Sequence, residues 1–250
     1  MTRTPPSGGA DPAVSAVIFD MDGLMLDTER IALRVWREAA TDLGLVLDDG
    51  IAGQMVGRST ATNRLMLQAH FGARFSYDDL AALADRRYRD VLATEGVPKK
   101  PGLVELLEML AARGVPRAVA TSTARELARH KLAQAGVLDY FEVVVGGDEV
   151  AQGKPAPDIF LRAADRLGEV AGQCVVLEDS APGIHAASAA GMVPILVPDG
   201  GRLPPPEIRA LARYVVESLH AARAVIERLV GRAGTPHFRQ RLTKSSVPTD

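Results

Sequence analysis

The stretch AVIFDMDGLMLDTE, residues 16–29, joins an apolar run directly to a group of acids. Residues 17–19 are large and apolar, a pattern typical of a buried strand. Asp20 and Asp22 follow this run, and a glycine after them allows a sharp turn. Acids at the end of an apolar strand repel one another unless a cation lies nearby. We therefore interpret this stretch as the start of a chemical site.

Short apolar runs and amphipathic helical patterns alternate along most of the chain. The predicted strands cover residues 14–19, 115–120, 142–145, 174–177, 193–197 and 214–216. The predicted helices cover residues 103–113, 124–135, 158–167, 182–190 and 219–230. Strands without polar alternation are buried on both faces, as in parallel sheets. The alternation predicts an α/β fold with a doubly wound, Rossmann-like parallel sheet.

Residues 28–98 interrupt this alternation with three helical patterns and no convincing strand. We predict a helical cap domain over 28–98, inserted after the first strand. The core domain then comprises residues 14–27 and 99–230. The segments 1–13 and 231–250 are predicted to be a flexible leader and a flexible tail, because both are short of apolar residues.

Composition excludes several classes of protein. The 250 residues are 47% hydrophobic with a net charge of −2, so no basic surface for nucleic acid is expected. Cys174 is the single cysteine, which rules out an intramolecular disulfide. No apolar run approaches the roughly 18 residues of a membrane span, and residues 1–13 lack a signal-peptide pattern. We expect a soluble cytoplasmic monomer without a membrane or nucleic-acid partner.

Polar side chains follow each predicted strand that lies near the centre of the sheet. In a doubly wound sheet, ligands bind beyond the carboxyl ends of the strands, where the strand order reverses. Taken singly, each residue fits an ordinary turn or helix cap. Their conjunction predicts one site, and its members are Asp20, Asp22, Thr121, Ser122, Lys154, Glu178 and Asp179.

The charges of this set predict a metal ion. Two like charges ~4 Å apart repel by about 4 kcal/mol at an effective dielectric constant near 20. Lys154 is the one cation that these strand ends supply. Oxygen ligands with room for water suit Mg²⁺, and no His or Cys cluster is present for zinc.

A metal ion beside a lysine favours a phosphoryl group as the substrate, because phosphoryl transfer needs neutralisation of charge. A carboxylate can attack phosphorus and form an aspartyl-phosphate. We expect neighbouring acids to raise the pKa of Asp22, so that it could donate a proton to the leaving oxygen.

Four motifs, FDMDG, ATS, GKPAPDIF and LEDSAPGIHAASAAGM, resemble in order the motifs of the haloacid dehalogenase superfamily of phosphohydrolases. The predicted cap is similar to that of the subgroup with beta-phosphoglucomutase and small sugar- or nucleotide-phosphate phosphatases. The first and third motifs are also similar to those of pseudouridine monophosphatase. The resemblance spans roughly residues 14–230.

The resemblance implies a role for each motif residue. Asp20 is the nucleophile and a Mg²⁺ ligand, and Asp22 is the general acid and base with its carbonyl on the metal. Thr121 and Lys154 hold phosphoryl oxygens. The resemblance also implies that Asp179 is a metal ligand supported by Glu178, and that Arg58 of VGRST contacts the substrate. We further expect Glu29 and Ser122 on the substrate side. Arg86 or Arg87 are additional candidates for that side.

The expected function is Mg²⁺-dependent hydrolysis of a small phosphorylated metabolite, a sugar phosphate or a nucleotide-like monophosphate. Two alternatives stay open: phosphoglucomutase-type transfer, and a phosphate-binding protein without turnover. The mutases carry a histidine where this chain has Ala32, which favours hydrolysis. Asp22 counts against carbon–halogen and carbon–phosphorus cleavage, because the relatives with those activities lack this second aspartate.

Overall fold

The computed structural model describes residues 13–55, 60–72, 75–201 and 203–230, with a six-stranded sheet at its centre. Every neighbouring pair of strands is parallel, in the order β3-β2-β1-β4-β5-β6. The predicted leader and tail lie outside the described residues, apart from Ala13. The strands are β1 Ala16–Phe19, β2 Arg117–Ala120, β3 Val143–Val145, β4 Cys174–Glu178, β5 Val193–Leu196 and β6 Tyr214–Val215.

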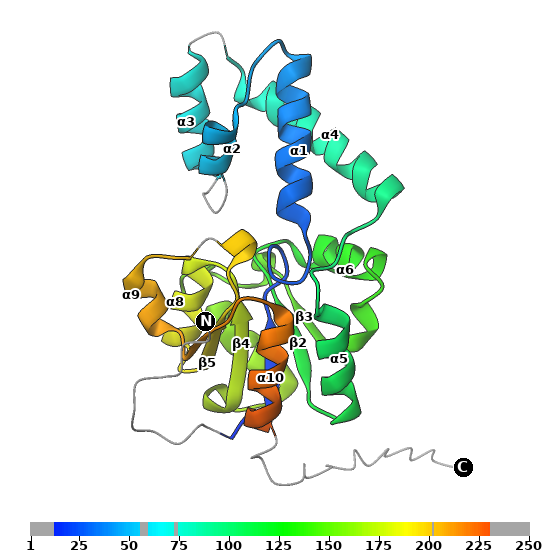
Figure 1. Ribbon diagram of the computed structural model, residues 1–250, viewed down its shortest axis with the longest axis vertical. Helices are drawn as coiled ribbons and strands as arrows, with labels where there is room; N and C mark the ends of the chain where they lie inside the picture. The colour runs from blue at the N-terminus through cyan, green and yellow to red at the C-terminus, as the bar shows by residue number, and fades with distance from the viewer. Residues whose placement is uncertain (1–12, 56–59, 73–74, 202, 231–250) are drawn as a thin grey trace, which may run out of the picture.

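Helices cover both faces of this sheet, which confirms the predicted α/β fold (Figure 1). The helices of this part are α5 Leu103–Ala112, α6 Arg125–Gln134, α7 Asp158–Leu167, α8 Ala181–Ala189, α9 Pro206–Leu211 and α10 Leu219–Val230. Single turns of 3-10 helix lie at η1 Leu138–Tyr140, η2 Gly147–Glu149, η3 Ala171–Gln173 and η4 Asp199–Gly201. The short helix α9, after three prolines, was not predicted.

Successive residues of β1 enter two different apolar clusters. Val17 and Phe19 pack into the larger cluster with residues of α5 and α10. Ala16 and Ile18 pack on the other face with residues of α7 and α8. Fully burying a large apolar side chain contributes roughly 1.5–3 kcal/mol, so the sheet is held firmly from both sides. The strand ends therefore provide a rigid base for the site.

Among the described residues between β1 and α5 lie four helices, rather than the three expected, and we call residues 28–98 the cap. They are α1 Thr28–Asp42, α2 Asp49–Met55, α3 Thr60–Phe71 and α4 Tyr77–Glu95. The sequence did not indicate α2 because its seven residues include two glycines, which disfavour helix. Figure 1 shows the cap as a separate layer above the carboxyl ends of the strands.

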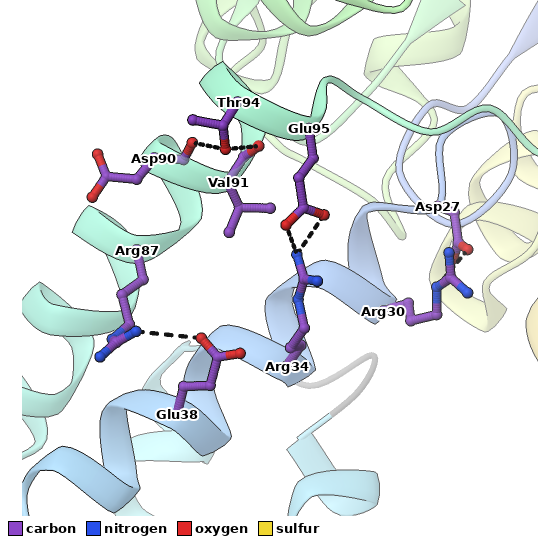
Figure 2. A network of polar contacts seen from close by, with 9 residues as sticks. All are labelled: Asp27, Arg30, Arg34, Glu38, Arg87, Asp90, Val91, Thr94 and Glu95. Carbon is purple, nitrogen blue, oxygen red and sulfur yellow. Dashed lines mark hydrogen bonds and ion pairs between the residues drawn. The ribbon is translucent and has the colours of Figure 1, made fainter.

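The long cap helices α1 and α4 pack along each other, and exposed ion pairs join them (Figure 2). Arg34 of α1 contacts Glu95 at 2.9 Å, and Arg87 of α4 contacts Glu38 at 3.4 Å. Arg87 therefore contributes to the contact between the two cap helices. Trp36 is partly buried and packs against the apolar cluster of the cap, with its ring centre 5.7 Å from that of Tyr77.

Two linkers connect cap and core side by side. Leu26 forms an antiparallel bridge with Lys99, and the Lys100 ammonium lies 3.2 Å from the Asp27 carboxylate. Lys100 also contacts Asp199 of the core. The chain thus enters and leaves the cap at one point.

No helix in the described ranges combines the length and the apolar character that a membrane span requires.

Candidate active site

The sheet register sets Asp20 and Glu178 beside each other. Phe19 of β1 lies opposite Leu177 of β4, so the next residue of each strand falls at the same level. The chain passes from β1 to the β2 side and returns to β4 on the other side, so strand order reverses between these two strands. Two acids that are distant in sequence therefore meet at the switch point of the sheet.

Lys154 lies between these two acids and is almost fully buried. Its ammonium lies 2.7 Å from Glu178 Oε1, and it also contacts Asp20 Oδ1. Burial alone would lower the pKa of Lys154, but the charges of Asp20 and Glu178 raise it. The ammonium of Lys154 lies over the Phe160 ring, with Nζ 4.8 Å from the ring centre. The lysine is held in place as a charged residue.

The pKa of Asp20 is shifted by its buried and charged surroundings. Burial raises the pKa of Asp20 to about 7, although the charge of Lys154 opposes the shift. Burial, with the charges of Glu178 and Asp20, also raises the pKa of Asp179 well above its ordinary value. One ammonium does not compensate all of these carboxylates. The predicted repulsion between the acids is therefore present in the structure.

Glycine at position 23 lets the chain approach Asp179 closely. Gly23 has φ of +90°, and a Cβ atom there would lie 2.5 Å from Asp179 Oδ2. The charge of Glu29, in the first turn of α1, also acts on Asp179. Glu29 therefore lies near enough to the acids of the core for its charge to act on them, and its place on the substrate side stays a prediction.

Asp20, Glu178 and Asp179 could hold a metal ion. Each offers a carboxylate oxygen, and these oxygens lie within 4.8 Å of one another. Carboxylate oxygens suit a hard divalent cation, and the charge of such a cation would lower the raised pKa values of Asp20 and Asp179. Glu178 already accepts hydrogen bonds from Lys154 and from the Ser180 N–H, so it supports the group more than it offers a free ligand.

The carboxylate of Asp22 points to a different set of partners. Its Oδ1 accepts from Thr28 Oγ1 at 2.7 Å and from Lys131 Nζ at 3.0 Å, and its Oδ2 accepts from Thr123 Oγ1 at 2.7 Å. Burial alone would raise the pKa of Asp22, but the charge of Lys131 and these hydrogen bonds lower it. The prediction that the pKa of Asp22 is raised was therefore wrong. Lys154 is also not the only lysine that reaches the acids.

The turn after β2 contributes Thr121 and Ser122. Thr121 is buried, and its Oγ1 accepts a hydrogen bond from the Thr123 N–H at 3.2 Å, which shapes the turn. Ser122 is exposed, and its carbonyl lies so close to Gly147 that any larger residue there would overlap it. Both residues lie at the carboxyl edge of the sheet. Arg58 falls outside the described residues.

The sequence did not indicate Lys131, Thr123 or Tyr88 as site residues. Lys131 follows Ala128 at a spacing of three and precedes Leu132, so it occupies the apolar face of α6, where it is buried. A lysine in an apolar stripe is a signal that could have been noticed, because an unpaired buried charge is costly.

The doubly wound sheet, the converging carboxylates and the inserted helices define a capped α/β protein with an acidic site at the switch point of its sheet. Residues 14–191 match the model of the haloacid dehalogenase-like hydrolases, and the chain belongs to this family.

Named relatives agree with this family. The phosphorylated carbohydrates phosphatase of Thermotoga maritima is 32% identical over 179 residues, which cover 72% of this chain and 82% of that protein. The fructose-1-phosphate phosphatase YqaB of Escherichia coli is 38% identical over 180 residues, covering 71% and 93%. The crystal structure of a HAD family hydrolase from Deinococcus radiodurans R1, with bound phosphate and sodium, is similar with a TM-score of 0.74 and 31% identity, covering 88% of this chain and 97% of that one.

Proposed function

We propose that this chain is a Mg²⁺-dependent phosphatase that hydrolyses a small phosphorylated metabolite, a sugar phosphate or a nucleotide-like monophosphate, through an aspartyl-phosphate. The observation that carries the proposal is the convergence of Asp20, Glu178 and Asp179 around the buried Lys154. Such a group binds a divalent cation and an anionic phosphoryl group together. Proteins of the same family are named for sugar-phosphate phosphatase activity, so the enzyme is a hydrolase of phosphoric monoesters.

The protein groups account for both halves of the reaction. An oxygen of Asp20 attacks phosphorus, and the bond from phosphorus to the leaving oxygen breaks. In the second half, Asp22 takes a proton from water, the water oxygen attacks phosphorus, and inorganic phosphate leaves Asp20 unmodified. The lowered pKa of Asp22 supplies the ionised carboxylate that this second half needs. In the first half, the proton on the leaving oxygen comes from the minor protonated form of Asp22.

Asp20, Asp179 and the backbone carbonyl of Asp22 are the groups that would hold Mg²⁺, with Glu178 as a further carboxylate. When bound, the ion offsets the negative charge of the phosphoryl oxygens. In this proposal, Lys154 and the hydroxyl of Thr121 hold the phosphoryl group in line with Asp20. Rigid strand ends fix these groups before the substrate arrives, which lowers the barrier without further reorganisation.

The cap provides the leaving-group side in this proposal. The charge of Glu29 acts on Asp179 of the core, and its carboxylate can accept hydrogen bonds from substrate hydroxyl groups, while Arg58 remains a sequence-based candidate. Ala32 lies half-buried on α1 and carries no proton donor or acceptor. We therefore favour water over a sugar hydroxyl as the acceptor of the phosphoryl group, and hydrolysis over mutase activity. A monomer is the expected form.

A panel of phosphorylated metabolites, assayed for release of inorganic phosphate with Mg²⁺ and with EDTA, tests the proposal. Sugar phosphates and nucleoside monophosphates are the two arms, and p-nitrophenyl phosphate serves as a substrate that does not depend on the cap. We expect turnover only with Mg²⁺. Phosphate binding without turnover across the panel would contradict the proposal and favour a binding protein. Equal turnover in EDTA would contradict the metal requirement.

A further inference from the structure

Lys131 is a buried lysine that the proposed chemistry does not use directly. It lies on α6, on the side of the core nearest the cap (Figure 1), and its side chain is 7% exposed. A buried ammonium is costly unless it is paired and hydrogen-bonded. An apolar residue would pack α6 at lower cost, since Ala128 and Leu132 on the same face do so. The position of this lysine therefore points to a role beyond packing.

The partner of Lys131 is the carboxylate of Asp22, at 3.0 Å. Thr28, at the start of the cap, and Thr123, in the turn after β2, donate to the same carboxylate. Both oxygens of Asp22 are thereby held by donors from three separate segments. A carboxylate held this way has a fixed orientation, which proton transfer to or from a reacting oxygen requires.

Tyr88 connects this group to the cap. Its ring centre lies 5.5 Å from Lys131 Nζ, and the two side chains interact electrostatically. Tyr88 belongs to α4, and its ring packs on the apolar cluster that includes residues of both cap and core. The lysine therefore lies between a catalytic carboxylate of the core and an aromatic side chain of the cap.

We propose that Lys131 and Tyr88 are positioning residues for Asp22, with Lys131 holding the carboxylate and Tyr88 holding the lysine when the cap lies over the core. This inference rests on the proposed function. Since neither residue lies among the groups assigned to the metal or the phosphoryl group, their loss changes the rate of turnover and leaves substrate binding largely intact. A cap that moves away would remove Tyr88 from Lys131 and loosen Asp22.

Four variants test this inference: Lys131→Met, Tyr88→Phe, the double variant, and Lys99→Met as the control. Lys99 donates to the carbonyl of Ala135 at the end of α6 at 2.8 Å, so the control removes a lysine contact to the same helix without touching Asp22. The readouts are kcat and KM for the best substrate of the panel, with circular dichroism and thermal unfolding to verify the fold.

We expect Lys131→Met to lower kcat at least tenfold with KM changed less than about threefold, because general acid–base catalysis contributes roughly 10²–10⁴-fold. Tyr88→Phe should lower kcat about three- to fivefold alone and add nothing to Lys131→Met, because residues that act through each other are not additive. Lys99→Met should leave kcat unchanged.

Several results would overturn the inference. Wild-type kcat in a folded Lys131→Met variant refutes the role of the lysine, and equal changes in kcat and KM point to substrate binding instead. If Lys131→Met does not fold, wild-type kcat in Tyr88→Phe refutes the coupling to the cap. A multiplicative fall in the double variant also refutes it. Absence of turnover in the wild-type protein refutes the proposed function and this inference with it, whereas the other outcomes leave the proposed function standing.

Discussion

Replacing Asp20 with asparagine should abolish turnover and make the metal-free protein more stable at alkaline pH. The pKa of Asp20 lies at about 7 in the folded protein against an ordinary 3.8, because burial disfavours the charge. The folded state therefore binds a proton that the unfolded state has released between these two values. Stability falls as the pH rises through this window, by about 1.4 kcal/mol per pH unit. The ionised form consequently costs roughly 4 kcal/mol above pH 7.

Asparagine keeps the shape of the side chain but cannot lose a proton. In EDTA, the difference in unfolding free energy between Asp20→Asn and wild type should grow by about 3 kcal/mol between pH 5 and pH 8. Denaturant unfolding at both pH values measures this difference. Mg²⁺ at pH 8 should stabilise the wild type and have little effect on the variant, because a ligand that binds only the folded state stabilises it.

Two separate results would refute this reasoning. Parallel stability curves for the two proteins between pH 5 and pH 8 would show that burial does not raise the pKa of Asp20 in the folded protein. Phosphatase activity near the wild-type rate in Asp20→Asn would exclude the covalent role, whatever the stability data show. The activity assay needs protein free of wild-type contamination, and mass spectrometry of the intact chain verifies this.

Three further predictions follow from the same geometry. Lys154→Met should abolish turnover and destabilise the protein by about 3–5 kcal/mol at neutral pH, because Glu178 and Asp20 lose their shared cation; unchanged denaturant midpoints would exclude a structural role for the pair. Gly23→Ala should weaken Mg²⁺ binding about 10–100-fold by pushing Asp179 aside, while Gly44→Ala, also at positive φ but with nothing within 4 Å, should not; titration of the metal decides between them. With beta-glucose 1-phosphate and glucose 1,6-bisphosphate, inorganic phosphate should dominate the products, and accumulation of glucose 6-phosphate would favour the mutase.

Most of the fold was predicted from the apolar runs, and the place of the site was predicted from the acids that follow them. Buried parallel strands have an unbroken apolar pattern, so β1 and β4 were found with boundaries displaced by two residues or fewer. The convergence of Asp20 and Glu178 was predicted from the strand-end rule, whereas the register that sets them side by side is given by the structure. The short helices α2 and α9 were missed because glycines and prolines mask a helical period.

The surroundings of Asp22 could not be predicted from the motifs. Spacing places Asp22 near Asp20 in sequence, which suggested repulsion and a raised pKa. The direction of its side chain depends instead on α6 and on the turn after β2, which bring Lys131 and Thr123 to it from over 100 residues away. Long-range packing of this kind leaves no local signal, and it reversed the sign of the pKa shift.

The paired linkers have a consequence for how such an enzyme could change its substrate. Leu26 and Lys99 form a β-bridge, so the chain leaves the core and returns to it at the same position, and the cap is an insertion between these two residues. The entropic cost of closing an insertion at that position changes only slowly with the length of the insertion. Cutting and rejoining the chain at residues 27 and 99 would remove no strand and disturb no register of the sheet. We expect the cap to be exchangeable, so that transplanting another helical insert at this junction could alter substrate choice while the strand-end carboxylates Asp20, Glu178 and Asp179 stay in place.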